Sequence, residues 1–213
     1  MTILKVLLVN GSPHKNGCTY TALCEVSKSL NQNEVDTDIF WIGTKPIAGC
    51  TGCHGCDKKN KCVFNDTVNE FLEIAGDYDG FVFGTPVHWG GICGSMTSFM
   101  DRAFYADLCG KGGRFLLKPA ASVISARRAG TTATWDQINK YFALMQMPII
   151  SSRYWTIVHG AKAEDVQQDI EGIQTMRILG KNMAYFLKCK DIATKMGISM
   201  PEQETAVLTN FIR

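Results

Sequence analysis

Four cysteines lie close together in the sequence and could bind a metal centre. They are Cys50, Cys53, Cys56 and Cys62, and they form the pattern C-x2-C-x2-C-x5-C. Two-residue spacings let successive sulfurs converge on one point, and four thiolates suit either a [4Fe–4S] cluster or zinc. Uncoordinated thiols or a redox pair are the alternatives. The four cysteines are therefore candidate metal ligands.

A second candidate site follows the first apolar run of the chain. Residues 4–9 lead into Asn10-Gly11-Ser12-Pro13, and a helical pattern begins shortly after Gly17. A helix N-terminus has unpaired N–H groups and about half a positive charge, so this turn predicts an anion site. The loop matches neither G-x-G-x-x-G nor G-x-x-x-x-G-K-[ST], which disfavours dinucleotides and nucleoside triphosphates. The phosphate of FMN is the leading candidate, and an ordinary strand-to-helix turn is the alternative.

Composition limits the class of protein. The chain has 213 residues, 46% of them hydrophobic and 20% charged, which suits a single globular domain. A net charge of +2 argues against a dedicated nucleic-acid binder. Nine cysteines, an odd number, do not suggest a disulfide framework.

The sequence also predicts where the protein acts. No apolar run approaches the roughly 18 residues that span a bilayer, so we expect no membrane association. The chain begins with a strand-like segment and shows no signal-peptide pattern, which favours the cytoplasm.

Strand-like and helix-like segments alternate along the chain, which predicts a doubly wound parallel α/β sheet. We expect one domain over residues 1–190, with a cysteine-rich loop at 49–62. A tail over 191–213 would pack on the body or on a neighbouring subunit. The expected strands are Ile3–Asn10, Val35–Trp41, Gly80–Gly84, Ala120–Ser125 and Ile149–Val158, and the expected helices are Tyr20–Leu30, Thr67–Ala75, Ser95–Phe104, Thr134–Met145 and Asp165–Leu187.

In such a sheet, ligands bind at the carboxyl ends of the strands. The loops after the first, third and fourth strands should meet there. The third-strand loop, Gly84–Gly91, contains a proline, an aromatic residue and glycines that let the backbone approach a flat ring. The fourth-strand loop, Ser125–Thr132, contains Arg127 and Arg128. Together the loops suit a flavin.

With these loops placed, the sequence resembles the flavodoxin-like NAD(P)H-dependent FMN reductases, and more narrowly their iron–sulfur flavoprotein branch. The resemblance covers the chain from the first strand to about Lys188 and implies five parallel strands with helices on both faces. Its phosphate loop has the form G-S-P-x-x-x-G-x-T, and its ring loop has the form S-P-V-Y-x-G. The residues thereby implied to contact FMN are Ser12, His14, Asn16, Gly17, Cys18 and Thr19 in the first loop, Thr85, Pro86, Val87, His88, Trp89 and Gly90 in the third, and Ala126, Arg128 and Gly130 in the fourth.

The resemblance also implies an activity. Cys50, Cys53, Cys56 and Cys62 would ligate a [4Fe–4S] cluster close to the flavin, NAD(P)H would be the reductant, and electrons would pass to a small acceptor. A ferredoxin-like partner could deliver single electrons instead. The family suggests a homodimer or homotetramer, and hydride transfer needs no named catalytic side chain.

Other functions fit the same residues. A quinone or azo reductase would use the same flavin site. A pure electron carrier is disfavoured by a pI of about 8.0, because such proteins are typically acidic. A redox-sensing module would use the cysteine loop.

Overall fold

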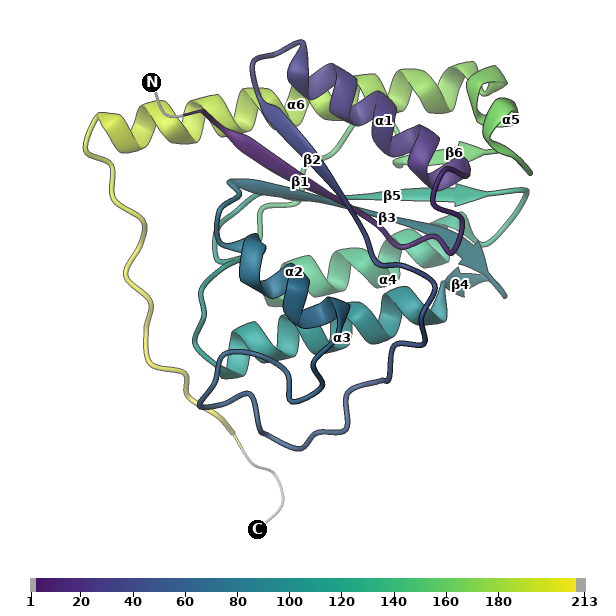
Figure 1. Cartoon of the computed structure of the whole chain (residues 1–213). Helices are drawn as coiled ribbons and strands as arrows, with labels where there is room; N and C mark the ends of the chain where they lie inside the picture. Colours follow the sequence, from purple (N-terminus) through teal and green to yellow (C-terminus); the bar gives the residue numbers. More distant parts are fainter. Residues whose placement is uncertain (1–2, 210–213) are drawn as a thin grey trace.

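The apolar segments of the chain form a twisted parallel sheet. The computed structural model describes residues 3–209, and in it the strands lie in the order β2 (Asp36–Trp41), β1 (Lys5–Asn10), β3 (Gly80–His88), β5 (Ala120–Ala126) and β6 (Ile157–His159) (Figure 1). In the register, Val6 of β1 lies between Thr37 of β2 and Gly80 of β3. The strand order reverses at β1, since the chain moves outward to β2 and then crosses back to β3. This confirms the predicted doubly wound fold.

Helices cover both faces of the sheet because its strands are apolar on both sides. Along β1, Val6 and Leu8 belong to one core, and Leu7 and Val9 belong to the other. Helices α1 (Cys18–Asn31), α5 (Ala163–Gln168) and α6 (Ile170–Lys195) lie on the first side. Helices α2 (Thr67–Ala75), α3 (Gly94–Cys109) and α4 (Thr131–Leu144) lie on the other, as Figure 1 shows.

The third strand continues beyond its predicted end at Gly84. It runs to His88, turns at Trp89 and Gly90, and pairs antiparallel with the short strand β4 (Gly91–Ile92). Both turn residues have positive φ, 50° for Trp89 and 79° for Gly90. A two-residue hairpin loop favours this conformation, because its twist matches that of the flanking strands. The expected ring loop is therefore a β-hairpin.

The fifth expected strand, Ile149–Val158, is largely wrong. Ile149 makes a single bridge to Ala120, and regular pairing resumes only at Ile157. The N–H of Ile150 donates to the carbonyl of Ala120, and the N–H of Ile124 donates to the carbonyl of Thr156. The segment from 150 to 156 is thus longer than the facing segment from 120 to 124, so its middle bulges away from β5.

The long helix expected over Asp165–Leu187 is two helices separated at Asp169. The carboxylate of Asp169 accepts from the N–H of Gly172 at 2.9 Å, which caps α6, and from the N–H of His159 at 2.7 Å. Helix α6 then continues to Lys195, past the expected end of the domain at 190.

Residues 194–209 of the predicted tail are exposed in this single chain. Residues 198–209 form no helix or strand (Figure 1), and packing of the tail on the body or on another subunit stays a prediction. The extreme ends of the predicted segments 1–190 and 191–213, namely residues 1–2 and 210–213, lie outside the described residues. Over residues 3–209, no helix combines the length and apolar character that crossing a bilayer requires.

Candidate functional site

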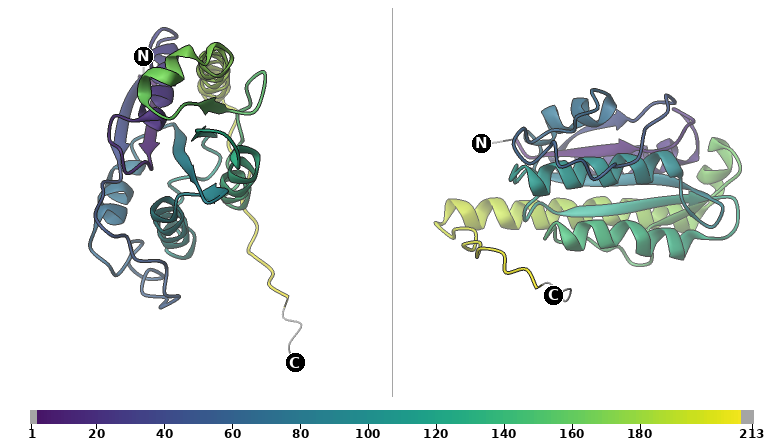
Figure 2. Two further views of the ribbon diagram at one scale, coloured as in Figure 1. Left: turned by 90° about the vertical axis from the view of Figure 1, so that its right-hand side faces the viewer. Right: turned by 90° about the horizontal axis from the view of Figure 1, so that it is seen from below.

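Three loops meet at the carboxyl edge of the sheet, which Figure 2 (left) views face-on. The N–H of Gly11 donates to the carbonyl of Gly84 at 2.8 Å, which joins the first loop to the third. The hydroxyls of Thr19 and Ser125 share a 2.7 Å hydrogen bond, which joins the first loop to the fourth. A Cβ on Gly130 would lie 2.8 Å from the Cα of Gly90, so the third and fourth loops touch as well. The predicted convergence of these loops is confirmed.

The first loop is held in place by its own polar groups. The side-chain oxygen of Asn10 accepts from the N–H of Ser12 at 3.0 Å, and the Ser12 hydroxyl oxygen accepts from the N–H of His14 at 3.1 Å. The indole N–H of Trp41 donates to the carbonyl of Ser12 at 2.8 Å. The Ser12 hydroxyl therefore keeps its own proton for donation to a ligand.

Helix α1 begins at this loop with unpaired amides. Within residues 3–209, no side chain caps it at Gly17. Among the described residues, the N–H groups of Cys18, Thr19 and Tyr20 have no hydrogen-bond acceptor. Three free amides at the positive end of a helix dipole form a site for an anion.

The side chains expected to contact the phosphate differ in their exposure to solvent. His14 and Asn16 are exposed at the rim, whereas Thr19 is 1% exposed, with its hydroxyl on Ser125. The Cys18 thiol donates to the carbonyl of Gly160 at 3.5 Å. Burial, assisted by the nearby acidic side chains of α5, raises the pKa of Cys18, so this thiol stays neutral beside an anion site.

The hairpin and the fourth loop form the open wall of the edge. Thr85 is buried, Pro86 and Val87 are partly buried, and the turn from His88 to Gly90 is exposed. The N–H of Ile92 donates to the side-chain oxygen of Gln137 at 3.1 Å, which fixes the hairpin to α4.

The fourth loop contributes a glycine in the left-handed backbone region and a cation. Gly130 has a φ of 87° and is the N-cap residue before α4, and Ala126 is buried at the end of β5. Arg128 is exposed and makes no ion pair within the described part of the chain. Its guanidinium is available to an anionic group.

The four candidate metal ligands line one pocket between their loop and α3. Cys56 is buried, Cys62 is partly buried, and Cys50 and Cys53 are exposed; Arg102 is on the α3 side of the pocket. Over residues 3–209, no set of three or more potential ligands is arranged to hold a metal ion, and the cysteines are free thiols. Four soft sulfur donors around one pocket nevertheless fit an iron–sulfur cluster by donor type and number.

An exposed thiol of this pocket, Cys53, and its buried thiol, Cys56, have pKa values shifted in opposite directions. Hydrogen bonds from the Gly55 backbone and the Thr51 hydroxyl lower the pKa of Cys53. Burial raises the pKa of Cys56. Iron binds the thiolate form, so the pKa shifts favour Cys53 over Cys56 as a ligand.

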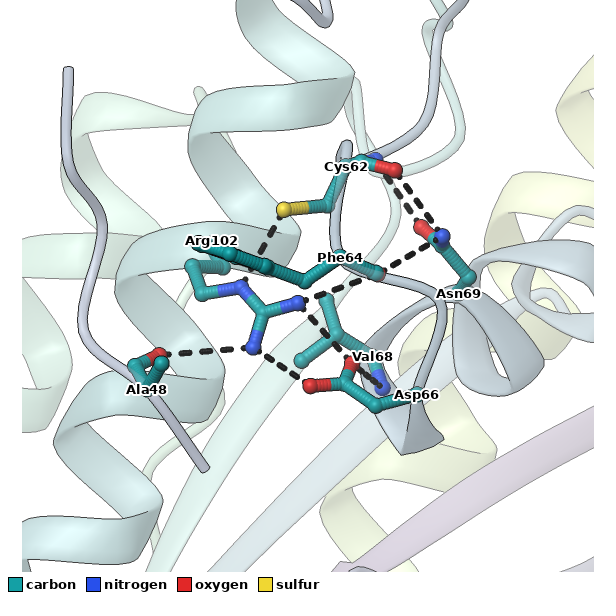
Figure 3. A network of polar contacts seen from close by, with 7 residues as sticks. All are labelled: Ala48, Cys62, Phe64, Asp66, Val68, Asn69 and Arg102. Carbon is teal, nitrogen blue, oxygen red and sulfur yellow. Dashed lines mark hydrogen bonds and ion pairs between the residues drawn. The ribbon is translucent and has the colours of Figure 1, made fainter. Parts of the chain in front are cut away.

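Arg102 is the site residue that sequence reasoning missed. It is 1% exposed and donates to Cys62 Sγ at 3.2 Å, as Figure 3 shows. Its partners lie 36 to 54 positions away in the sequence, so no local pattern reveals them.

The cysteine pocket lies along α3 and away from the carboxyl edge. Arg102 follows the first residue of α3, Gly94, by eight positions. At 1.5 Å per residue, this is about 12 Å along the helix axis. The predicted closeness of the cysteines to the flavin therefore stays a prediction.

With this geometry in view, comparison with known proteins identifies the class. The chain belongs to the NADPH-dependent FMN reductase family, whose model matches residues 4–162. It is 29% identical over 190 residues to an iron-sulfur flavoprotein of Methanocaldococcus jannaschii, a match that covers 87% of this chain and 98% of that protein. These matches confirm the predicted family and its iron–sulfur flavoprotein branch.

Solved structures show the fold independently of sequence. The structure of RosB with bound 8-demethyl-8-formylriboflavin-5'-phosphate has a TM-score of 0.67 at 13% identity, covering 99% of this chain and 94% of RosB. A flavodoxin from the domain Archaea has a TM-score of 0.57 at 13% identity, covering 87% and 99%. The fold is flavodoxin-like. Family and fold together support FMN as the cofactor and a role in flavin-dependent oxidation–reduction or electron transfer.

Proposed function

We propose that this protein is an FMN-dependent oxidoreductase that takes electrons from NAD(P)H and passes them to a small acceptor, partly through a [4Fe–4S] cluster. The observation that carries the proposal is the convergence of three loops around the uncapped start of α1. FMN supplies both hydride and single-electron chemistry when bound.

The residues at the edge suit the parts of FMN. The amides of Cys18 and Thr19 and the Ser12 hydroxyl would hold the phosphate, with Asn16, Gly17 and His14 at the rim. The hairpin from Thr85 to Gly90 would lie along the isoalloxazine, with Ala126 and Gly130 opposite. The Arg128 guanidinium would favour negative charge on the ring. No side chain needs to move a proton for hydride transfer, so we assign no catalytic residue.

The cysteine pocket would hold the cluster through Cys50, Cys53, Cys56 and Cys62. Its support is the shared pocket, the Arg102 hydrogen bond to one sulfur, and the likeness to proteins named iron-sulfur flavoproteins. When bound, a cluster supplies one-electron transfer, which would let a ferredoxin-like partner act as donor or acceptor.

Anaerobic purification tests both cofactors. We expect flavin absorption bands, about one FMN per chain, and iron with matching sulfide. Oxidation of NADH and NADPH is then followed with quinones, azo dyes and a ferredoxin as acceptors. A protein that binds no FMN would overturn the proposal. FMN without iron would leave a flavin reductase and remove the cluster.

The assembly and location of the protein are also proposals. The family resemblance supports a homodimer or homotetramer in the cytoplasm that binds neither nucleic acid nor membrane. Light scattering on the purified protein would give the mass of the assembly, and a monomeric mass would contradict it.

A further inference from the structure

Arg102 is a buried charged residue beside the cysteine pocket. Its side chain is fully buried, and burying a guanidinium is costly unless its charge and its donors are all satisfied. Asp66 supplies the opposite charge, with its two oxygens 2.7 and 2.9 Å from the terminal nitrogens of Arg102. The guanidinium carbon of Arg102 also lies over the ring of Phe64, 5.0 Å from the ring centroid.

Every N–H of this guanidinium has a partner. Besides Asp66, the terminal nitrogens donate to the carbonyls of Ala48 at 3.3 Å and Phe64 at 3.2 Å. The remaining donor, Nε–H, is directed at Cys62 Sγ at 3.2 Å (Figure 3). A neutral thiol is a weak acceptor, whereas a thiolate sulfur bound to iron is a good one.

Asn69 fixes Cys62 from a second side. Its side-chain oxygen accepts from the N–H of Cys62 at 2.9 Å, and its amide donates to the carbonyl of Cys62 at 2.9 Å and to that of Phe64 at 3.0 Å. Cys62 is therefore held by α2 through its backbone and by α3 through its sulfur. Figure 3 shows both sets of contacts.

We infer that Arg102 is the positioning residue of the cysteine site: it fixes Cys62 as the anchored ligand and raises the reduction potential of the cluster. This rests on the proposed function, since it needs a cluster. Reduction adds one negative charge to the cluster, and a cation with a hydrogen bond to a ligand sulfur stabilises that charge. Asp66 partly opposes the effect because its carboxylate lies beside the same guanidinium.

The test is a set of anaerobic redox titrations on the full-length holoprotein, with the cluster followed by EPR and the flavin by absorption. Arg102→Met should shift the cluster midpoint to a more negative potential. Asp66→Asn should shift it to a more positive one, because asparagine still caps α2 while the guanidinium loses its counter-charge. The flavin midpoint should stay unchanged in both.

Arg114→Met is the matched control. Arg114 also anchors the cysteine loop, through Asn60 at 2.6 Å, and also pairs with an aspartate, Asp107 at 2.8 Å. Among the described residues it donates to no cysteine. A purely structural role predicts similar losses of iron in Arg102→Met and Arg114→Met with no shift in potential.

The outcomes separate this inference from the proposed function. Wild-type protein without iron overturns the cluster and this inference together. Wild-type protein with iron, combined with an unshifted midpoint in an iron-loaded Arg102→Met, overturns only the role of Arg102. If Arg102→Met loses its iron, the cluster midpoint of Asp66→Asn decides the question. A midpoint more positive than that of the wild type supports the inference. An unchanged or more negative midpoint overturns it.

Discussion

At the carboxyl edge of the sheet the groups that face a ligand are mainly backbone, whereas around the cysteine pocket they are side chains. The edge depends on free amides of α1 and on glycines where loops touch. The pocket depends on the four cysteines and on Arg102, Asp66 and Asn69. Substitutions that add side-chain atoms should therefore impair the carboxyl edge most, and substitutions that remove side-chain atoms should impair the cysteine pocket most.

The largest effect is expected from removing a side chain beside the pocket. Asp66→Ala leaves the Arg102 guanidinium buried without a counter-charge and removes the cap of α2, so we expect a loss of about 3–5 kcal/mol in unfolding free energy. Urea denaturation measures it. Glu25→Ala breaks an ion pair at the surface, with Arg177, and should cost about 0–1 kcal/mol. Equal losses would contradict the dependence of the buried Arg102 guanidinium on its counter-charge.

The next largest effect is expected from a substitution that adds side-chain atoms at the carboxyl edge. Gly130→Val introduces strain at a φ of 87° and a Cβ against the Gly90 backbone, so we expect FMN binding to weaken by about tenfold or more, or about 1.4 kcal/mol. Fluorescence titration with FMN measures this. Gly197→Val is the control: its φ is 88°, and a Cβ there would meet no atom of residues 3–209 within 4 Å. Unchanged FMN affinity in Gly130→Val would argue against contact of this loop with the flavin.

The hydroxyl pair under the edge should have a smaller effect on FMN binding than Gly130→Val. Thr19→Val leaves the buried Ser125 hydroxyl without its partner, at a cost of about 1–3 kcal/mol in stability. If Thr19 acts by positioning the loop, Ser125→Ala should weaken FMN binding to a similar extent, and the double variant should add little. Thr175→Val, which removes a buried hydroxyl that donates to the carbonyl of Glu171 within α6, is the control. Additive losses of FMN affinity would instead place the Thr19 hydroxyl on the phosphate itself.

The smallest effect is expected at the hairpin tip. Trp89 is fully exposed, so Trp89→Ala should change stability by less than about 0.5 kcal/mol. Loss of a ring that stacks on the flavin should still weaken FMN binding by about 0.5–1.5 kcal/mol. Trp155→Ala removes an exposed tryptophan outside the edge and serves as the control. Identical affinities in the two variants would assign no flavin contact to Trp89.

The same contrast explains what the sequence could predict. Strands β1 and β5 were predictable because mostly apolar runs indicate a sheet that is covered on both faces, and the loops at the edge follow from the fold. The hairpin after Gly84 was missed because Trp89-Gly90 is not among the usual turn pairs. The fifth strand was overextended, since apolar character in residues 149–158 does not reveal how many residues face β5.

The cysteine pocket was only half predictable. The spacing of Cys50, Cys53, Cys56 and Cys62 indicates a shared centre, and the structure does place all four around one pocket. Arg102 could not be found in this way, because its contacts join α3 to loop segments distant in the sequence. Such contacts follow from tertiary packing, which periodicity does not encode.

The double role of Asp66 has a consequence for motion. The same carboxylate accepts from the N–H of Val68 in the first turn of α2 and from Arg102, which in turn holds Cys62. Breaking one of these contacts weakens the others. The first turn of α2 and the backbone around Cys62 should therefore open together as one cooperative unit. In amide hydrogen exchange, the N–H groups of Val68 and Cys62 should then exchange with a common opening free energy.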